Sequence, residues 1–304
     1  MALNGRKVNL FIVGAAKCGT TSMYNYLSEH NDVFMSSVKE PNFFSEVHSS
    51  KKYTYSTPKK NNKYGAKIIK DINVYYSLFE GLNNEKIIGE ASPSYLWDKQ
   101  TASKIYEYNQ DSKIIILLKE PIERAYSHFL MNYNGGIEKE KNFVKAVIND
   151  YNLNETVFDK SPLYIRLGQY FDQINEYHKY FPSDQILILK SVDFLSNTLS
   201  TLTFVASFLK IDSEYFNKID LKKYNETWLP KNKLFRIFIK LYYKFFLSDY
   251  INNKLSNKNK KFLKQTFFKK KNSNNQLTNT ERNQLKSFFE ESNDNLFRDY
   301  GIKF

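Results

Sequence analysis

Short, uninterrupted apolar runs separated by helical patterns are the feature that most constrains the fold of this chain. Residues 113–118 read Lys-Ile-Ile-Ile-Leu-Leu, and shorter runs occupy 8–14, 86–90 and 186–189. Continuous runs of this length are typical of strands that are buried on both faces of a sheet. Helical patterns lie between them, at about 19–28, 98–108, 121–133, 139–151, 164–180 and 198–209. The alternation predicts an α/β fold, with a parallel sheet flanked by helices.

The 304 residues contain no Gly-, Ser- or Pro-rich linker, so we expect a single domain over residues 1–304. The composition changes after Pro230, where an amphipathic helical pattern covers 233–247 and a last one covers 280–296. We therefore expect an α-helical C-terminal addition, with a lysine-rich helical extension over about 232–275. The lysines of this extension are expected to form either a solvated surface or a positively charged surface that attracts an acidic acceptor.

A glycine-containing turn follows the first predicted strand and leads directly into a helix. It reads Gly14-Ala-Ala-Lys17-Cys18-Gly19-Thr20-Thr21-Ser22. Strand, turn and helix N-terminus together form a cradle of backbone N–H groups for an anion. The Gly14-x4-Gly19 spacing is that of a nucleoside-triphosphatase loop, but Thr20 stands where such a loop carries its lysine. A lysine in mid-loop, at Lys17, is placed instead to contact the group that leaves a single 5′-phosphate.

A second candidate phosphate site follows the strand at 113–118. Lys119 comes directly after that strand, and Pro121 suits the first turn of the next helix. Ser127 lies about two turns into this helix. Arg124, in the same helix, is expected to form a structural ion pair, the alternative being a contribution to phosphate binding.

These motifs resemble those of sulfotransferases that use 3′-phosphoadenosine 5′-phosphosulfate (PAPS), especially the glycan (heparan-type) and bacterial branch. Residues 17–22 resemble the 5′-phosphosulfate loop of that family, and residues 118–127 resemble its 3′-phosphate motif. Residues 39–44 (Lys-Glu-Pro-Asn-Phe-Phe) and 89–95 (Gly-Glu-Ala-Ser-Pro-Ser-Tyr) are similar to two further segments of the branch. The resemblance covers essentially the whole chain. It implies a P-loop-type parallel sheet, PAPS as the donor and adenosine 3′,5′-bisphosphate as the product.

The resemblance also implies a role for individual residues. Donor contacts are implied for Lys17, Cys18, Gly19, Thr20, Thr21, Ser22, Lys119, Ser127 and Lys231. Lys17 would also be catalytic, and Glu40 matches the base that takes the acceptor proton, with His48 as the alternative base. Glu90, at a predicted strand end, would contact the acceptor or have a structural role. Lys119 stands where the family usually has Arg, and lysine cannot form a bidentate fork on phosphate.

The expected function is in-line transfer of a sulfuryl group from PAPS to a hydroxyl or amine of a carbohydrate or glycolipid, with an acidic acceptor as one option. The first alternative is a P-loop kinase for a small metabolite, which would need a lysine at position 20 and an acidic Mg²⁺ ligand after a strand. The second is a non-enzymatic binder of acidic glycan or nucleic acid. The formal net charge of +13 fits this alternative, but the two phosphate motifs would have no purpose. We expect no nucleic-acid partner.

The cysteines and histidines of the chain limit the disulfide and metal sites that it can form. The single cysteine, Cys18, excludes a disulfide framework. The four histidines, at 30, 48, 128 and 178, are scattered, and we expect no metal. No apolar segment is long enough to span a bilayer. The expected location is the cytoplasm, the alternative being the lumen of a Golgi-type compartment if the chain belongs to a longer protein, and the oligomeric state is left open.

Overall fold

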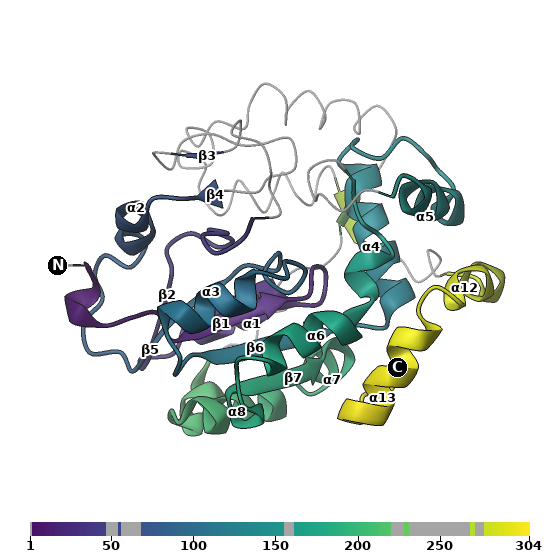
Figure 1. The fold of residues 1–304 in the computed structure, drawn as a ribbon. Helices are drawn as coiled ribbons and strands as arrows, with labels where there is room; N and C mark the ends of the chain where they lie inside the picture. Colours follow the sequence, from purple (N-terminus) through teal and green to yellow (C-terminus); the bar gives the residue numbers. More distant parts are fainter. Residues whose placement is uncertain are drawn as a thin grey trace.

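A five-stranded sheet lies at the centre of the computed structural model (Figure 1), which describes residues 2–46, 54–55, 68–154, 161–219, 228–230, 268–270 and 277–304. In spatial order its strands are β2 (Val33–Met35), β5 (Ile87–Ala91), β1 (Leu10–Gly14), β6 (Lys113–Leu118) and β7 (Ile186–Lys190). Every pairing in this sheet is parallel. The predicted α/β fold is therefore confirmed.

The strands form where the sequence is continuously apolar. All five residues of β1 and the last five of β6 are buried, so each strand is covered on both faces. Two short ladders lie outside this sheet. They pair β3 (Thr54–Tyr55) with β4 (Ile68–Ile69) and β8 (Trp228–Pro230) with β9 (Phe268–Lys270).

Helices connect the strands and cover the sheet. They are α1 (Thr20–Ser28), α2 (Ile72–Ser77), α3 (Thr101–Tyr108), α4 (Pro121–Asn134), α5 (Phe143–Asn152), α6 (Tyr170–His178), α7 (Ser191–Ser196), α8 (Thr198–Leu209), α12 (Asn279–Lys286) and α13 (Glu290–Tyr300). Short 3₁₀ helices span Ala2–Gly5, Arg166–Gly168, Ser183–Gln185 and Ser213–Lys218. The connection β1–α1–β2 runs toward one sheet edge and β5–α3–β6 runs toward the other. Right-handed crossovers therefore place α1 and α3 on opposite faces, and α6 lies beside α3 (Figure 1).

The patterns at 164–180 and 280–296 are the ones whose helices depart most from what the sequence indicated. The pattern at 164–180 yields an α-helix only from Tyr170, because Arg166–Gly168 form a 3₁₀ turn that Gly168 fits closely. A Cβ at Gly168 would lie 2.9 Å from the Phe289 ring. The last pattern, 280–296, is divided between α12 and α13.

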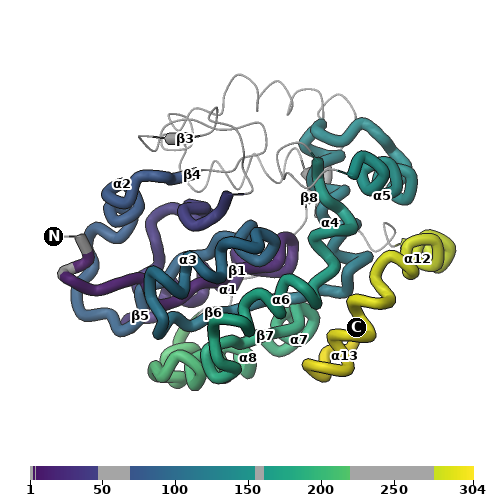
Figure 2. The backbone as a smooth tube through the Cα atoms, in the orientation of Figure 1, coloured from purple at the N-terminus to yellow at the C-terminus, as the bar shows by residue number. Residues whose placement is uncertain are grey.

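The two C-terminal helices pack against the strand-connecting helices (Figure 2). Helix α12 contacts α4 and α5, and α13 contacts α6. Leu285 and Phe289 are buried in a cluster with Ile122 of α4. The backbone N–H of Phe171 also donates to Ser292 Oγ at 3.2 Å. Lys231, His48 and most of the predicted lysine-rich extension lie outside the described residues.

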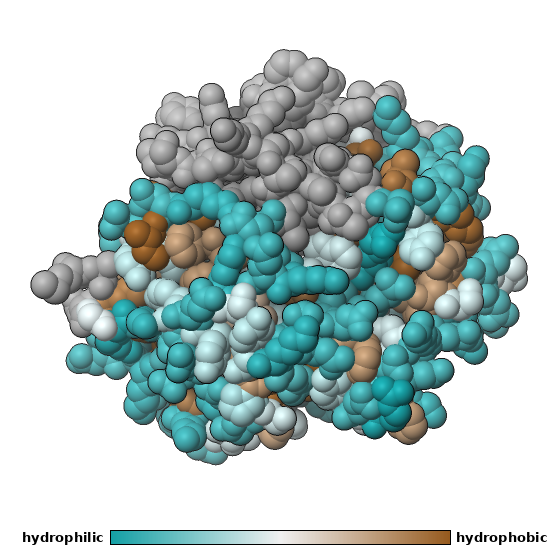
Figure 3. Space-filling view, in the orientation of Figure 1, coloured by the Kyte–Doolittle hydropathy of each residue, from teal (hydrophilic) through white to brown (hydrophobic). Residues whose placement is uncertain are grey.

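The parallel strands bring their carboxyl-terminal ends to one edge of the sheet. Lys17 follows β1, Glu40 follows β2, and Lys119 follows β6. Open α/β sheets bind ligands at this edge. The view in Figure 3 shows a mostly hydrophilic surface over the described residues, with apolar side chains in separate small groups. None of the helices in the described ranges is long and apolar enough to cross a membrane.

Candidate active site

The loop between β1 and α1 is shaped by two residues in the left-handed region. Gly19, the N-cap of α1, has φ 96°, and Lys17 has φ 72°. The first N–H groups of a helix have no acceptor within the helix, so the start of α1 is a candidate anion site, although the Ser22 N–H donates to the Gly19 carbonyl at 3.0 Å. Thr20 as a whole is buried, at 4% exposure.

Lys17 stands at the point where three loops meet. Its side chain is half-buried, and its ammonium contacts the Met131 sulfur at 3.5 Å. Burial and the nearby charge of Lys119 lower the pKa of Lys17, while Glu40 acts in the opposite direction. These mutual effects place the side chains that follow β1, β2 and β6 in one electrostatic neighbourhood. Such a cluster of cations favours a multiply charged anion.

Cys18 faces the interior. Its thiol is fully buried, with its sulfur 3.8 Å from the Tyr170 hydroxyl, and burial raises its pKa. The Tyr170 hydroxyl donates to the Lys119 carbonyl at 2.9 Å, and the Ser191 hydroxyl donates to the Cys18 carbonyl. Cys18 therefore helps to join the loops after β1, β6 and β7, and its thiol lies on the interior side of the loop after β1. Tyr170 and Ser191 were not identified from the sequence.

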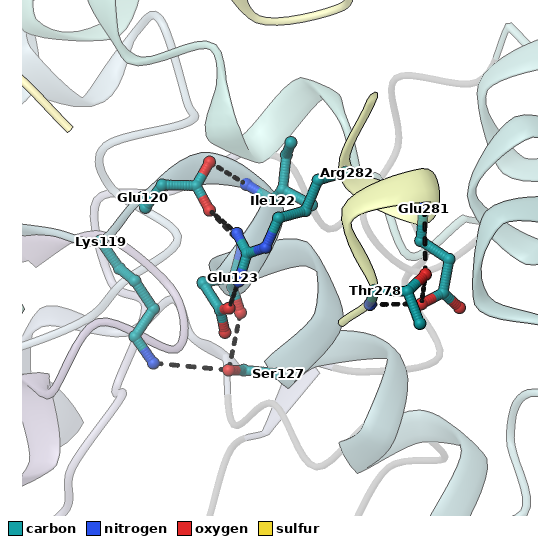
Figure 4. A network of polar contacts seen from close by, with 8 residues as sticks. All are labelled: Lys119, Glu120, Ile122, Glu123, Ser127, Thr278, Glu281 and Arg282. Atoms are coloured by element: carbon teal, nitrogen blue, oxygen red, sulfur yellow. Dashed lines mark hydrogen bonds and ion pairs between the residues drawn. The ribbon is translucent and has the colours of Figure 1, made fainter. Parts of the chain in front are cut away.

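Lys119 and Ser127 meet, although eight residues separate them (Figure 4). The Lys119 ammonium lies 3.4 Å from Ser127 Oγ, and this hydroxyl donates to the Glu123 carbonyl at 2.8 Å. Helix α4 creates this geometry because Glu120 caps its start, accepting from the N–H of Ile122 and of Glu123 at 3.0 and 2.9 Å. A cation and a hydroxyl are thereby held side by side at the end of β6.

Arg124 does not form an ion pair with any described residue, contrary to the expectation from sequence. Its guanidinium is fully buried and donates from Nη2 to the Tyr164 carbonyl. Nε and Nη1 have no hydrogen-bond partner among the described residues. Burial lowers the pKa of Arg124. The side chain points into the core beneath α4, so an acidic surface partner cannot reach it there.

The segment that carries Glu40 is fixed by its backbone. Glu40 and Asn42 have φ values of 61° and 53°. The Glu40 N–H donates to the Ala91 carbonyl at 3.0 Å, and the Asn42 amide donates to the Glu40 carbonyl at 2.8 Å. The Asn42 N–H in turn donates to Ser92 Oγ at 3.2 Å. The Glu40 carboxylate, whose side chain is 44% exposed, is left accessible and pairs with Lys39.

Glu90 lies directly beneath this segment, in the interior. It is 0% exposed and accepts from the hydroxyls of Tyr75, Tyr95 and Ser92 at 3.0, 2.8 and 2.7 Å. Burial raises the pKa of Glu90 to about 7, and the three hydroxyl hydrogen bonds oppose this shift. The structure shows a structural role for Glu90, while a direct contact with an acceptor stays a prediction. Asn42 and Ser92, which connect Glu90 to Glu40, were overlooked, although both lie within motifs that the sequence singled out.

A family model matches nearly the whole chain, and curated relatives match about two thirds of it. The model of the sulfotransferase domain family matches residues 7–297. Carbohydrate sulfotransferase 15 of Mus musculus is 25% identical in an alignment 259 positions long, which covers 67% of this chain and 44% of that protein. Heparan sulfate glucosamine 3-O-sulfotransferase 5 of Homo sapiens is 24% identical over 200 residues, 66% of this chain and 52% of that protein. This chain thus spans about half the length of these relatives.

A solved structure shares the fold. A sulfotransferase from Alicyclobacillus acidocaldarius superposes with a TM-score of 0.70 at 22% identity, and the match covers 98% of both chains. The family match includes the loop after β1 and the start of α4, where the sequence motifs pointed to two phosphate sites. The resemblance drawn from these motifs is confirmed, and the chain belongs to the sulfotransferase domain family.

Proposed function

We propose that this chain transfers the sulfuryl group of PAPS to a hydroxyl of a carbohydrate. One observation carries the proposal: two anion-binding elements, the loop with Lys17 and the Lys119–Ser127 pair, follow the neighbouring strands β1 and β6. A donor that carries one phosphate on each side of a ribose matches two such elements placed side by side. A triphosphate would instead place its charges in a row along one loop.

Each residue has a distinct part in the proposed reaction. The acceptor oxygen attacks sulfur, the bond between sulfur and the bridging oxygen breaks, and adenosine 3′,5′-bisphosphate leaves. Lys17 neutralises the charge that grows on the bridging oxygen, with help from the N–H groups at the start of α1. Glu40 accepts the proton of the acceptor hydroxyl. Lys119 and Ser127 hold the 3′-phosphate and thereby orient the donor.

A carbohydrate acceptor is supported by the matched relatives, which are named for carbohydrate and heparan sulfate. The net charge of +13 favours an acidic acceptor, since surface cations raise the local concentration of anionic partners. A glycolipid headgroup offers the same hydroxyl chemistry. Free glycans and glycolipids therefore belong together in one acceptor panel.

The test is release of adenosine 3′,5′-bisphosphate from PAPS in the presence of this panel, together with the mass gain of one sulfuryl group on an acceptor. Lys17→Ala should abolish most of the acceptor-dependent release. Lys218→Ala is the matched control, because Lys218 is exposed on a 3₁₀ helix that packs against α8, away from the strand ends. The proposal fails if wild-type protein sulfates no member of the panel, or if ATP with Mg²⁺ phosphorylates one instead.

A further inference from the structure

Two acidic residues lie between Lys119 and Ser127, in the segment that carries the proposed 3′-phosphate site. Glu120 caps α4, and Glu123 lies in its first turn, one helical turn before Ser127. Acidic side chains stabilise a helix N-terminus. The same charges would repel an anion bound by Lys119 and Ser127. The sequence thus places a favourable helix cap where it conflicts with phosphate binding.

Arg282 of α12 resolves this conflict (Figure 4). Its Nη1 lies 3.3 Å from Glu120 Oε2, and its Nη2 contacts Glu123 Oε1. One guanidinium therefore pairs with both carboxylates at once, although it comes from a segment 159 residues after Glu123. All three side chains are about one third exposed. Pairs of this exposure are only partly screened by water.

The start of α12 fixes the position of Arg282. Thr278 and Glu281 form a capping box, in which the Glu281 N–H donates to Thr278 Oγ1 at 3.2 Å and the Thr278 N–H donates to Glu281 Oε2 at 2.9 Å. Leu285, one turn further on, is fully buried. A capped and buried helix start restricts the guanidinium to the neighbourhood of α4.

We propose that Arg282 is a specificity-determining residue for the 3′-phosphate of the donor, which it does not itself bind. By pairing with Glu120 and Glu123 and offsetting one of their two negative charges, it leaves the Lys119 ammonium free to serve the phosphate beside Ser127. Without Arg282, the two carboxylates repel the 3′-phosphate and compete for Lys119. The inference rests on the proposed function, because it needs the 3′-phosphate to bind at Lys119 and Ser127. It adds a residue from the C-terminal helices to that site.

The test compares the dissociation constants of adenosine 3′,5′-bisphosphate and AMP, which differ by the 3′-phosphate. Arg282→Gln should weaken the bisphosphate roughly fivefold, as expected for partly exposed charges, and leave AMP almost unchanged. The loss of affinity for the bisphosphate in Arg282→Gln should be smaller at high salt, because salt screens the carboxylates. Glu123→Gln added to Arg282→Gln should restore most of the discrimination, and Arg282→Lys should preserve it. Lys286→Gln is the control on the same helix, since Lys286 pairs with Glu290 at 3.4 Å.

The outcomes separate the inference from the proposed function. If wild-type protein binds the bisphosphate and AMP equally, the 3′-phosphate site itself is wrong. If wild-type protein discriminates and Arg282→Gln discriminates just as well, the inference is overturned. An equal loss for both ligands would also overturn it, because Arg282 would then act only by holding α12 in place. Failure of Glu123→Gln to rescue would refute the role of the carboxylates.

Discussion

Replacing Glu90 by Gln should change how the stability of this protein depends on pH. Glu90 is fully buried and accepts hydrogen bonds from Tyr75, Tyr95 and Ser92. Burial raises the pKa of Glu90 from 4.5 to about 7 in the folded protein. In the unfolded chain the carboxyl regains its ordinary pKa. Glu90→Gln retains the shape of the side chain and removes its titration.

The size of the effect follows from the two pKa values. The folded protein holds the Glu90 proton more tightly, so the stabilising contribution is fully present below pH 4.5 and is lost as the pH rises through 7. A shift of this size corresponds to about 3 kcal/mol in the free energy of unfolding. Most of this loss falls between pH 5 and pH 8. At pH 8 the wild-type protein therefore contains a carboxylate that the interior solvates poorly.

The assay is urea denaturation of both proteins, followed by circular dichroism at pH 5, 6, 7 and 8. The free energy of unfolding of Glu90→Gln minus that of the wild type should rise by roughly 2–3 kcal/mol across this range. A pH-independent change in the free energy of unfolding caused by the amide would not alter this rise. A difference that stays flat within about 0.5 kcal/mol would refute the reasoning, because Glu90 would then titrate alike in the folded and unfolded states.

The remaining predictions concern the donor site. Adenosine 3′,5′-bisphosphate should raise the melting temperature more than AMP or ATP does, with no requirement for Mg²⁺; equal stabilisation by ATP with Mg²⁺ would favour a kinase. Lys119→Ala combined with Ser127→Ala should reduce the difference between the melting-temperature rises that the bisphosphate and AMP cause. An unchanged difference would show that the 3′-phosphate binds at another site. Cys18→Ala should leave the dissociation constant of the bisphosphate within about twofold by calorimetry, because the thiol faces Tyr170 in the core. A large loss would show that the thiol side of the loop contacts the donor.

The strands of the fold could be predicted because their apolar runs are continuous. Strand β6 appears with the predicted bounds, and β1, β5 and β7 differ from prediction by one or two residues. Strand β2 was not predicted, since three residues carry too little pattern to separate a strand from a loop. Helix boundaries depended on local turns such as Arg166–Gly168, which hydrophobic periodicity does not reveal.

The candidate site was predictable where it follows strand ends. Lys17 and Lys119 come directly after strongly apolar runs, so parallel pairing alone places them at one edge of the sheet. Arg282 and Tyr170 reach this edge through tertiary packing of helices from distant parts of the chain. A single sequence gives no signal for such contacts. The hydrogen bonding of Glu90 was also hidden, because it combines the hydroxyls of Ser92 and Tyr95, from its own segment, with that of Tyr75 from α2.

The most direct test of the central claim is a comparison of turnover and donor binding in Glu40→Gln. Glu40 is proposed to act on the acceptor and Lys17 on the donor. A change at Glu40 should therefore affect turnover and leave donor binding intact. Sulfuryl transfer should fall by about 10²–10⁴-fold, because an amide cannot take the acceptor proton, while the dissociation constant of adenosine 3′,5′-bisphosphate should stay nearly unchanged. A Glu40→Gln protein that keeps more than about a third of its turnover, or that loses bisphosphate binding in parallel, would contradict the account.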